Sequence, residues 1–164
     1  MSAVAPQIFT DRLYLNNITE EDAEMIVELR SNPEVYKYFI NSIKITVEEH
    51  LRWFSNSYLQ DKNRIDFMAR KKKDGTQVGI FGLKRITDST AEISYILSSS
   101  NQGRGYAREA ICALMNWIKN YEWKCNKVIA TIHQSNQRSI DFIKGMGYVF
   151  SEKQESFVIY EKQL

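Results

Sequence analysis

Apolar residues along the chain follow two different spacings, and the changes of spacing mark the elements that the sequence predicts. Weak alternation over Leu13–Asn17 predicts a first strand. A capping-box pattern at residues 19–22 (TEED) predicts a helix that ends at Pro33, because the residue before a proline avoids helical geometry. A second capping box at residues 46–49 (TVEE) predicts another helix.

Three β-rich segments follow these helices, over residues 65–71, 78–86 and 91–97. Asp74-Gly75 is a strong hairpin signal between the first two, and residues 87–90 join the second and third in the same way. We therefore expect three consecutive antiparallel strands. A long helix should come next, because the apolar residues after Gly105 recur at helical spacing: Ala107, Ile111, Leu114 and Ile118.

The rest of the chain predicts a buried strand over residues 127–132, a helix over about 136–144, and strands over 148–151 and 157–160. The resulting order is β-α-α-β-β-β-α-β-α-β-β. It predicts an α/β fold with a mixed sheet, antiparallel except around the third helix, in one domain over residues 1–164.

Composition narrows the class of protein. The 164 residues are 43% apolar and 12% aromatic, which is typical of a folded globular chain. A net charge of +2 gives no basic excess for nucleic acid, and no membrane span or secretory signal is visible, so a cytoplasmic protein is expected. The two cysteines lack disulfide or metal-ligand spacing, so no metal is expected, and we expect Cys112 to be a buried free thiol.

The segment "SSSNQGRGYAREA", residues 98–110, brings bare backbone N–H groups to the start of the long helix. Such a helix entry suits an anion such as phosphate. The segment lacks the lysine of a Walker loop, and it lacks the third small residue and the parallel surroundings of a dinucleotide site. What remains is the pattern Q-x-x-G-x-A, with Gln102, Gly105 and Ala107 at its defining positions.

This pattern resembles the acetyl-CoA-binding segment [QR]-x-x-G-x-[GA] of the GNAT superfamily of N-acetyltransferases. "TDRLYLNNITEEDAE" resembles the opening of the subgroup that contains the ribosomal-protein N-terminal acetyltransferases, and "NQRSIDFIKGMGY" resembles the end of the family's fourth helix. The element order is also that of the family. The chain is therefore identified as a GNAT-like N-acetyltransferase.

The resemblance implies acetyl-CoA as co-substrate, in a gap where the fourth and fifth strands splay apart. It implies backbone bonds from Ile96 and Leu97 to the pantetheine arm, with Asn136 and Ser139 on its other side. The pyrophosphate would lie on the loop made of Gln102, Gly103, Arg104, Gly105, Tyr106 and Ala107. Simpler roles stay open: a helix cap for Asn136, a helix-surface position for Ser139, and a solvent-facing side chain for Arg104.

Acetyl transfer needs a neutral amine and a stabilised oxyanion. Glu92 is the first candidate for the catalytic base, with a solvent-exposed glutamate as the alternative reading. His50 is a second candidate and His133 a third, although a packed histidine is the more ordinary role. Many family members carry a tyrosine on the last helix that reprotonates the CoA thiolate. Ile143 stands at the matching position, so either Ser139 or Tyr160 replaces it or the thiolate leaves unaided.

Two acceptor classes compete. Residues 29–54 (LRSNPEVYKYFINSIKITVEEHLRWF) resemble GNAT enzymes that acetylate the 4-amino group of nucleotide-linked deoxysugars. The opening segment instead resembles enzymes that acetylate protein N-termini, for which Glu48 and Glu49 are candidate groups. A non-catalytic acyl-CoA-binding module is a third reading, and the state is either monomer or homodimer. The side chains suited to a sugar are Tyr38, Asn41, His50 and Trp53.

Overall fold

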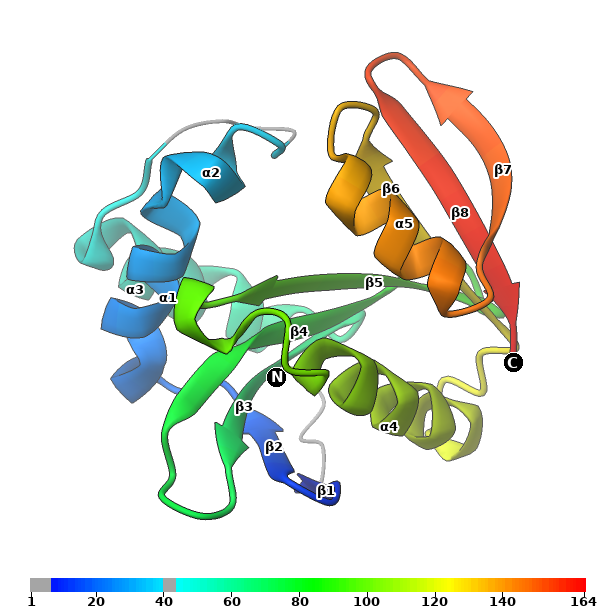
Figure 1. Cartoon of the computed structure of the whole chain (residues 1–164). Coiled ribbons are helices and arrows are strands. Elements are labelled where there is room, and N and C mark those ends of the chain that lie inside the picture. Colours follow the sequence, from blue (N-terminus) through cyan, green and yellow to red (C-terminus); the bar gives the residue numbers. More distant parts are fainter. Residues whose placement is uncertain (1–6, 40–43) are drawn as a thin grey trace.

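A computed structural model describes residues 7–39 and 44–164, so Asn41 lies outside the described part. Over these residues the strands form one sheet in the order β1-β2-β3-β4-β5-β6-β8-β7 (Figure 1). All neighbours are antiparallel except β5 and β6. The strands are β1 (Ile8–Phe9), β2 (Leu13–Asn17), β3 (Arg64–Lys71), β4 (Gln77–Arg85), β5 (Thr90–Leu97), β6 (Lys127–His133), β7 (Val149–Gln154) and β8 (Phe157–Gln163).

The helices agree with the predicted order and add one short element. They are α1 (Ala23–Ser31), α2 (Pro33–Tyr36), α3 (Val47–Asn56), α4 (Tyr106–Asn120) and α5 (Gln137–Gly145), with 3₁₀ turns at Glu20–Asp22, Tyr58–Gln60 and Ser99–Asn101. The proline that ends α1 also begins α2, because the Asn32 side chain accepts a hydrogen bond from the Glu34 N–H and caps it. Neither β1 nor α2 was predicted from the pattern, since each is too short to show a period.

Helices cover both faces of the sheet. The larger core lies between the sheet and the helices α4 and α5, with Phe67, Phe81, Ile111 and Leu114 at its centre. The smaller core lies under α1 and α3, where Ile26 and Phe54 pack on Met68 of β3. Figure 1 shows α1, α2 and α3 gathered at one side of the molecule and α5 with β6 to β8 at the other.

The strands β5 and β6 separate soon after they meet. Their parallel pairing runs only from Thr90 opposite Lys127 to Glu92 opposite Ile129. Beyond that point β5 continues along β4, and β6 continues along β8. The mixed α/β sheet and the splayed fourth and fifth strands of the prediction are therefore confirmed, with β5 and β6 as the splayed pair.

The two cysteines differ in their exposure to solvent. Cys112 is exposed on α4, so the expectation of a buried thiol is wrong, whereas Cys125 is buried, and both are free thiols. Cys112 follows Ile111, whose side chain faces the core, so one further step around the helix points to solvent.

Within the described residues, no helix combines the length and the apolar character that a membrane span requires.

Candidate active site

A cleft of about 1080 Å³ opens where β5 and β6 part. One wall comes from α1 and α2 with strands β3 and β4, and the other comes from β6 and the first turns of α5. The floor is the second half of β5, and one end is closed by the loop before α4. Nearly every predicted cofactor residue therefore lines a single cavity, although those residues come from three separate segments of the chain.

We call residues 102–107 the glycine loop. Gly103 and Gly105 have left-handed φ angles of +73° and +83°, which other residues rarely adopt. Gly105 is the N-cap of α4, and no side chain caps the helix there, so the first backbone N–H groups stay free for a ligand. A Cβ at Gly103 would meet no atom within 4 Å, so the loop borders open space. This helix entry fits an anion such as a pyrophosphate.

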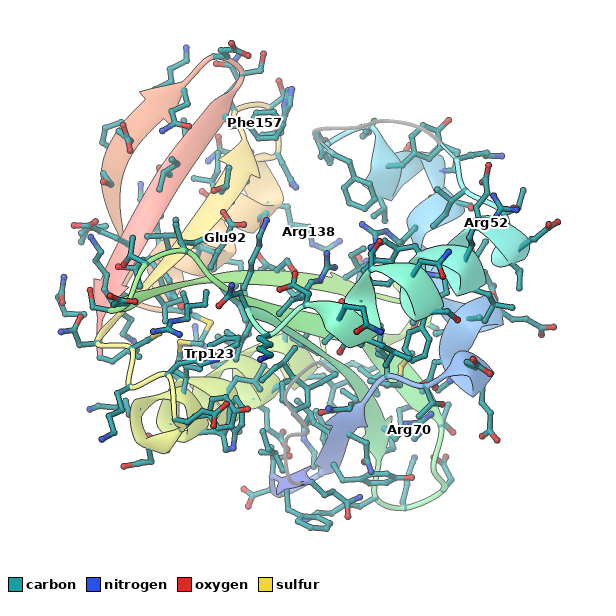
Figure 2. The ribbon with its side chains drawn as sticks, turned by 180° about the vertical axis from the view of Figure 1, so that it is seen from behind. Arg52, Arg70, Glu92, Trp123, Arg138 and Phe157 are labelled. Carbon is teal, nitrogen blue, oxygen red and sulfur yellow. The ribbon has the colours of Figure 1, made fainter. Side chains whose placement is uncertain are left out.

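Gln102, in the glycine loop, links the floor of the cleft, formed by β5, to the wall formed by α5. Its Nε2 donates to the carbonyl oxygen of Leu97 at 3.3 Å, and its Oε1 accepts from Arg138 Nη1 at 2.7 Å. Arg138 lines the cleft from α5 and is labelled in Figure 2. Arg104, in contrast, is exposed and does not line the cleft, and its Nε donates to the Ser100 carbonyl.

The register of β4 and β5 decides which backbone groups of β5 face the gap. Ser98 N–H donates to the Val78 carbonyl, and Ile96 stands opposite Ile80. Because hydrogen-bonded pairs alternate along an antiparallel ladder, the backbone groups of Ile96 point toward β4. Those of Tyr95 and Leu97 point toward the gap, so Ile96 contributes a side chain to the cleft and not a backbone donor.

Asn136 and Ser139 occupy the first turn of α5 and both line the cleft. The Asn136 Oδ1 caps the helix by accepting from Ser139 N–H at 3.3 Å, which leaves the Nδ2 group as the donor available to a ligand. Ser139 Oγ and the Tyr95 hydroxyl lie 2.5 Å apart and share a hydrogen bond. The Tyr95 ring packs edge-on against Phe142, and burial raises the pKa of Tyr95 to about 12.

Glu92 lies at the last residue pair that joins β5 to β6, and its side chain lines the cleft. Its Oε2 accepts a hydrogen bond from Thr131 Oγ1 at 2.7 Å, across from β6. This donor fixes the carboxylate while Oε1 remains available as a proton acceptor. Glu92 is labelled in Figure 2.

The two histidines have different positions. His50 does not line the cleft: it is 2% exposed in α3, and neither of its ring nitrogens has a hydrogen-bond partner among the described residues. Burial, reinforced by the charges of Arg30 and Arg64 and opposed by Asp66, lowers the pKa of His50. His133 does line the cleft, and its ring lies 5.8 Å from that of Tyr38 on the opposite wall.

The wall of the cleft formed by α1, α2, β3 and β4, which we call the acceptor side, carries charges of both signs, with Glu34 and Asp66 among its acids. Arg64 forms an ion pair of 2.9 Å with Asp66, and Lys84 lies at the rim. Arg30 is partly buried and lines the same space, and no ion pair or hydrogen bond joins it to another described residue; its guanidinium lies over the face of the Phe39 ring. Burial and the nearby Arg64 charge lower the pKa of Arg30, while Asp66 raises it. The described residues contain no cluster of acidic, histidine and cysteine side chains that is suited to a metal ion.

The residues considered for the role of the missing tyrosine differ in whether they reach the cleft. Ile143 is fully buried in the larger core and does not line the cleft. Tyr160 is buried on β8, where its ring packs against Phe150, and it is likewise absent from the cleft lining. Ser139 is therefore the one of the two named candidates that reaches the cleft.

Several residues of this region were missed in the sequence, among them Arg12, Arg30, Tyr95, Thr131 and Arg138. Tyr95 and Thr131 were hidden because each sits inside a strand whose residue types suit packing equally well. Arg12 is brought to the glycine loop by the fold alone, since 92 positions of the chain separate it from Arg104. Only Arg138 had a local signal, a cation in the first turn of a helix, where it opposes the dipole.

The model of the acetyltransferase (GNAT) domain family matches residues 12–149. The Methanocaldococcus jannaschii protein MJ1062 is 28% identical over 93% of this chain, but the chain spans only 31% of that protein's length. The N-acetyltransferase p20 of Bacillus licheniformis is 25% identical, with 94% of this chain and 87% of that protein covered. A crystallised domain from M. jannaschii is 28% identical with a TM-score of 0.80, covering 94% of this chain and all of that one.

Two more distant solved structures share the fold. FdhC, described as a nucleotide-linked sugar GNAT, has a TM-score of 0.78 at 17% identity, covering 98% of this chain and 91% of that one. RimL, a ribosomal L7/L12 alpha-N-protein acetyltransferase in complex with coenzyme A, has a TM-score of 0.81 at 15% identity, covering 97% and 98%. The family match spans most of the chain and includes the glycine loop and the separating strands. The chain therefore belongs to the GNAT acetyltransferases, enzymes that transfer an acetyl group to an amine.

Proposed function

We propose that this chain transfers the acetyl group of acetyl-CoA to the amino group of a nucleotide-linked deoxysugar, at its 4-position. The observation that carries the proposal is Arg30, a partly buried cation that lines the acceptor side of the cleft and forms no ion pair with a described residue, although the charge of Asp66 acts on it from a distance. A buried charge is costly unless it is paired. A nucleotide-linked sugar brings its own phosphate groups to pair with it.

The donor end of the cleft fits coenzyme A. Free N–H groups of the glycine loop and the start of α4 suit the pyrophosphate, and the helix dipole adds to the attraction. The open edge of β5, with the backbone groups of Tyr95 and the N–H of Leu97, offers a strand-like partner to the pantetheine arm, while the Leu97 carbonyl accepts from Gln102. Asn136 and Ser139 stand on the other side of the same gap.

The chemistry requires a base, an oxyanion donor and a leaving thiolate. Glu92, held by Thr131, takes a proton from the acceptor amine, directly or through a water, so that nitrogen can form its bond to the acetyl carbon. A backbone N–H on the free edge of β5 donates to the oxyanion. The carbon–sulfur bond then breaks, and the Tyr95–Ser139 pair donates a hydrogen bond to the thiolate.

The aromatic residues at the mouth support the acceptor class. Tyr38 and Phe39 from the α2 side face His133 and Phe157 from the β6–β8 side across the cleft. Flat apolar faces of this kind suit a sugar ring or a nucleobase. Trp53, by contrast, lies behind Arg64, with its ring 4.9 Å from that guanidinium, and does not line the cleft.

A protein N-terminus is the competing acceptor. The acidic groups expected to serve it do not reach the cleft, because Glu49 caps α3 and Glu48 pairs with the exposed Arg52. A polyamine would meet the positive charges of Arg30 and Lys84. The same wall also carries Glu34 and Asp66, so its charge does not separate the acceptor classes, and both belong in the test.

The experiment measures CoA thiol release with acceptors at equal concentration. The panel contains a uridine-diphosphate-linked 4-amino-4,6-dideoxy sugar, the same amino sugar as a methyl glycoside, an N-terminal peptide and spermidine. We expect the nucleotide-linked sugar to react fastest. Arg30→Gln should raise its KM about tenfold or more while leaving the KM for acetyl-CoA unchanged.

Arg52→Gln is the matched control, because Arg52 lies on the outer face of α3, as Figure 2 shows, and should change neither constant. Faster release with the peptide would overturn the acceptor assignment in favour of protein N-terminal acetylation. Calorimetric binding of acetyl-CoA without thiol release from any acceptor would indicate a non-catalytic acyl-CoA-binding module.

A further inference from the structure

A cation from the turn between β1 and β2, Arg12, lies against the glycine loop. We propose that Arg12 is a positioning residue for acetyl-CoA binding: it fixes the glycine loop and cancels the charge of Glu109, which would otherwise repel the pyrophosphate. The inference rests on the proposed binding of acetyl-CoA at this loop. It assigns a role to the "TDRL" segment, residues 10–13, for which the sequence resemblance implied no site residue.

Arg12 holds the loop through its guanidinium. Its Nη1 donates to the carbonyl oxygen of Arg104 at 3.0 Å, in the middle of the loop. The guanidinium also lies over the Tyr106 ring, 4.4 Å from the centroid, at the first residue of α4. A Cβ on Gly105 would come within 3.3 Å of Arg12 Nη2, so the side chain follows the left-handed turn closely. Arg12 thereby contacts the residues on both sides of Gly105.

The same side chain neutralises an acid at the helix entry. Glu109 lies in the first turn of α4, one turn from the N–H groups proposed to bind phosphate. Its Oε2 pairs with Arg12 Nε at 2.7 Å, while its Oε1 accepts from Arg12 N–H at 2.7 Å and from Thr10 Oγ1. Burial alone would raise the pKa of Glu109, but these hydrogen bonds from Thr10 and Arg12 outweigh it and hold the pKa below its ordinary value. Glu109 is therefore charged near neutral pH.

The charge of Glu109 at the start of α4 acts on both the helix and a bound phosphate, and Arg12 offsets it. An acid in the first turn stabilises a helix, but it opposes a second anion at the same end. With Arg12 in contact, the pair is close to neutral as seen from the ligand, and the helix entry keeps its attraction for phosphate. Without Arg12, the negative charge of Glu109 would stand unopposed beside that entry.

The test is calorimetric titration of acetyl-CoA into four proteins: wild type, Arg12→Met, Glu109→Gln and the double variant. We expect Arg12→Met to weaken binding about tenfold or more, and Glu109→Gln to change it little. The double variant should recover a large part of the loss, because the unopposed charge is gone. Raising the salt concentration should narrow the gap between Arg12→Met and wild type.

Kinetics and controls separate positioning from general damage. For Arg12→Met, the KM for acetyl-CoA should rise while kcat at saturation and the acceptor KM stay unchanged, and Arg12→Lys should restore part of the affinity. Arg85→Met is the matched control, since Arg85 pairs with the exposed Asp88 and does not line the cleft. If Arg12→Met destabilises the fold, the recovery in the double variant and the Lys variant still report on the charge.

Two outcomes would overturn the inference while leaving the proposed function intact. The first is wild-type affinity in the folded Arg12→Met protein. The second is a double variant as weak as Arg12→Met, which would mean that Glu109 exerts no repulsion. Absence of acetyl-CoA binding by the wild type is distinguishable from both, because it would refute the proposed function itself.

Discussion

The hydroxyl groups of Tyr95 on β5 and Ser139 on α5 share a hydrogen bond of 2.5 Å at the wall of the cleft. Both residues line the cleft, whereas Ile143, at the position where the sequence resemblance expects a tyrosine, is buried in the core. Burial raises the pKa of Tyr95 to about 12, whereas an ordinary thiol has a pKa near ~8.5. Full proton transfer to the thiolate would therefore be uphill, and hydrogen-bond donation is the role that these values favour.

Tyr95→Phe tests this role with the ring packing on Phe81 and Phe142 retained. Loss of one hydrogen bond should lower kcat roughly three- to tenfold, with acetyl-CoA affinity and stability nearly unchanged. Ser139→Ala should behave similarly. The measurement is steady-state kinetics, and a fall in kcat of about a hundredfold or more would instead identify Tyr95 as the proton donor.

Gly105→Asp should weaken binding of acetyl-CoA by about a hundredfold, because it places a negative charge at the glycine loop. At about 5 Å from a phosphate charge the repulsion is about 3 kcal/mol with an effective dielectric constant near ~20, which is on the order of a hundredfold in affinity. Gly105→Asn is the control of equal shape, because both residues tolerate the left-handed φ of +83° better than other side chains. If calorimetry finds the two variants equally weak, strain and not charge explains the loss.

The fold was predictable where the chain has strong local signals. Both capping boxes are present, with Thr46 and Glu49 bonded reciprocally and Asp22 accepting from the Thr19 N–H. The hairpin at Asp74-Gly75 is also present, with Gly75 at a φ of +74°. Each of these signals acts over a few residues, and so each is visible in a single sequence.

The site was predictable in its donor half and much less so in its acceptor half. The glycine loop and the start of α5 carry compact motifs, and their residues line one cleft. Which backbone groups of β5 face the gap depends on the register with β4, which no local pattern reveals. The partners of Glu92 and Arg12 come from distant elements, so only the folded sheet brings Thr131 and Glu109 to them.

Glu92 and Thr131 should affect turnover unequally if Glu92 is the base. Glu92→Gln should lower kcat about a hundredfold or more, because the amide cannot accept the amine proton. Thr131→Val should lower it less, because it removes only the hydrogen bond of 2.7 Å that orients the carboxylate, and Thr131→Ser should restore it. Steady-state kinetics with a saturating acceptor measures both, and near-wild-type turnover in Glu92→Gln would leave the base unassigned.

His50 should matter for stability and its pH dependence, and not for catalysis. Burial lowers its pKa from the ordinary 6.5, so the unfolded chain binds a proton that the folded chain resists. The unfolding free energy should therefore decrease as the pH falls below about 6.5 toward the lowered pKa. His50→Phe should flatten that part of the profile relative to wild type in urea titrations, and it should leave kcat unchanged. A large loss of kcat in this variant would restore His50 as a catalytic residue.

Ile143 stands at the position where the sequence resemblance expects a catalytic tyrosine, yet its side chain is fully buried. Ile143→Ala should cost about 2–5 kcal/mol of stability through the cavity it leaves, and Ile143→Val about 0.5–1.5 kcal/mol. Ile143→Tyr should also destabilise, by about 1–3 kcal/mol, because the larger side chain overpacks the core around Ile140 and Tyr148. Urea titration gives these values, and kcat per folded molecule should stay near that of wild type in all three variants. A fall in kcat at unchanged stability and KM would mean that residue 143 faces the reacting atoms and that the cleft wall differs from the one described.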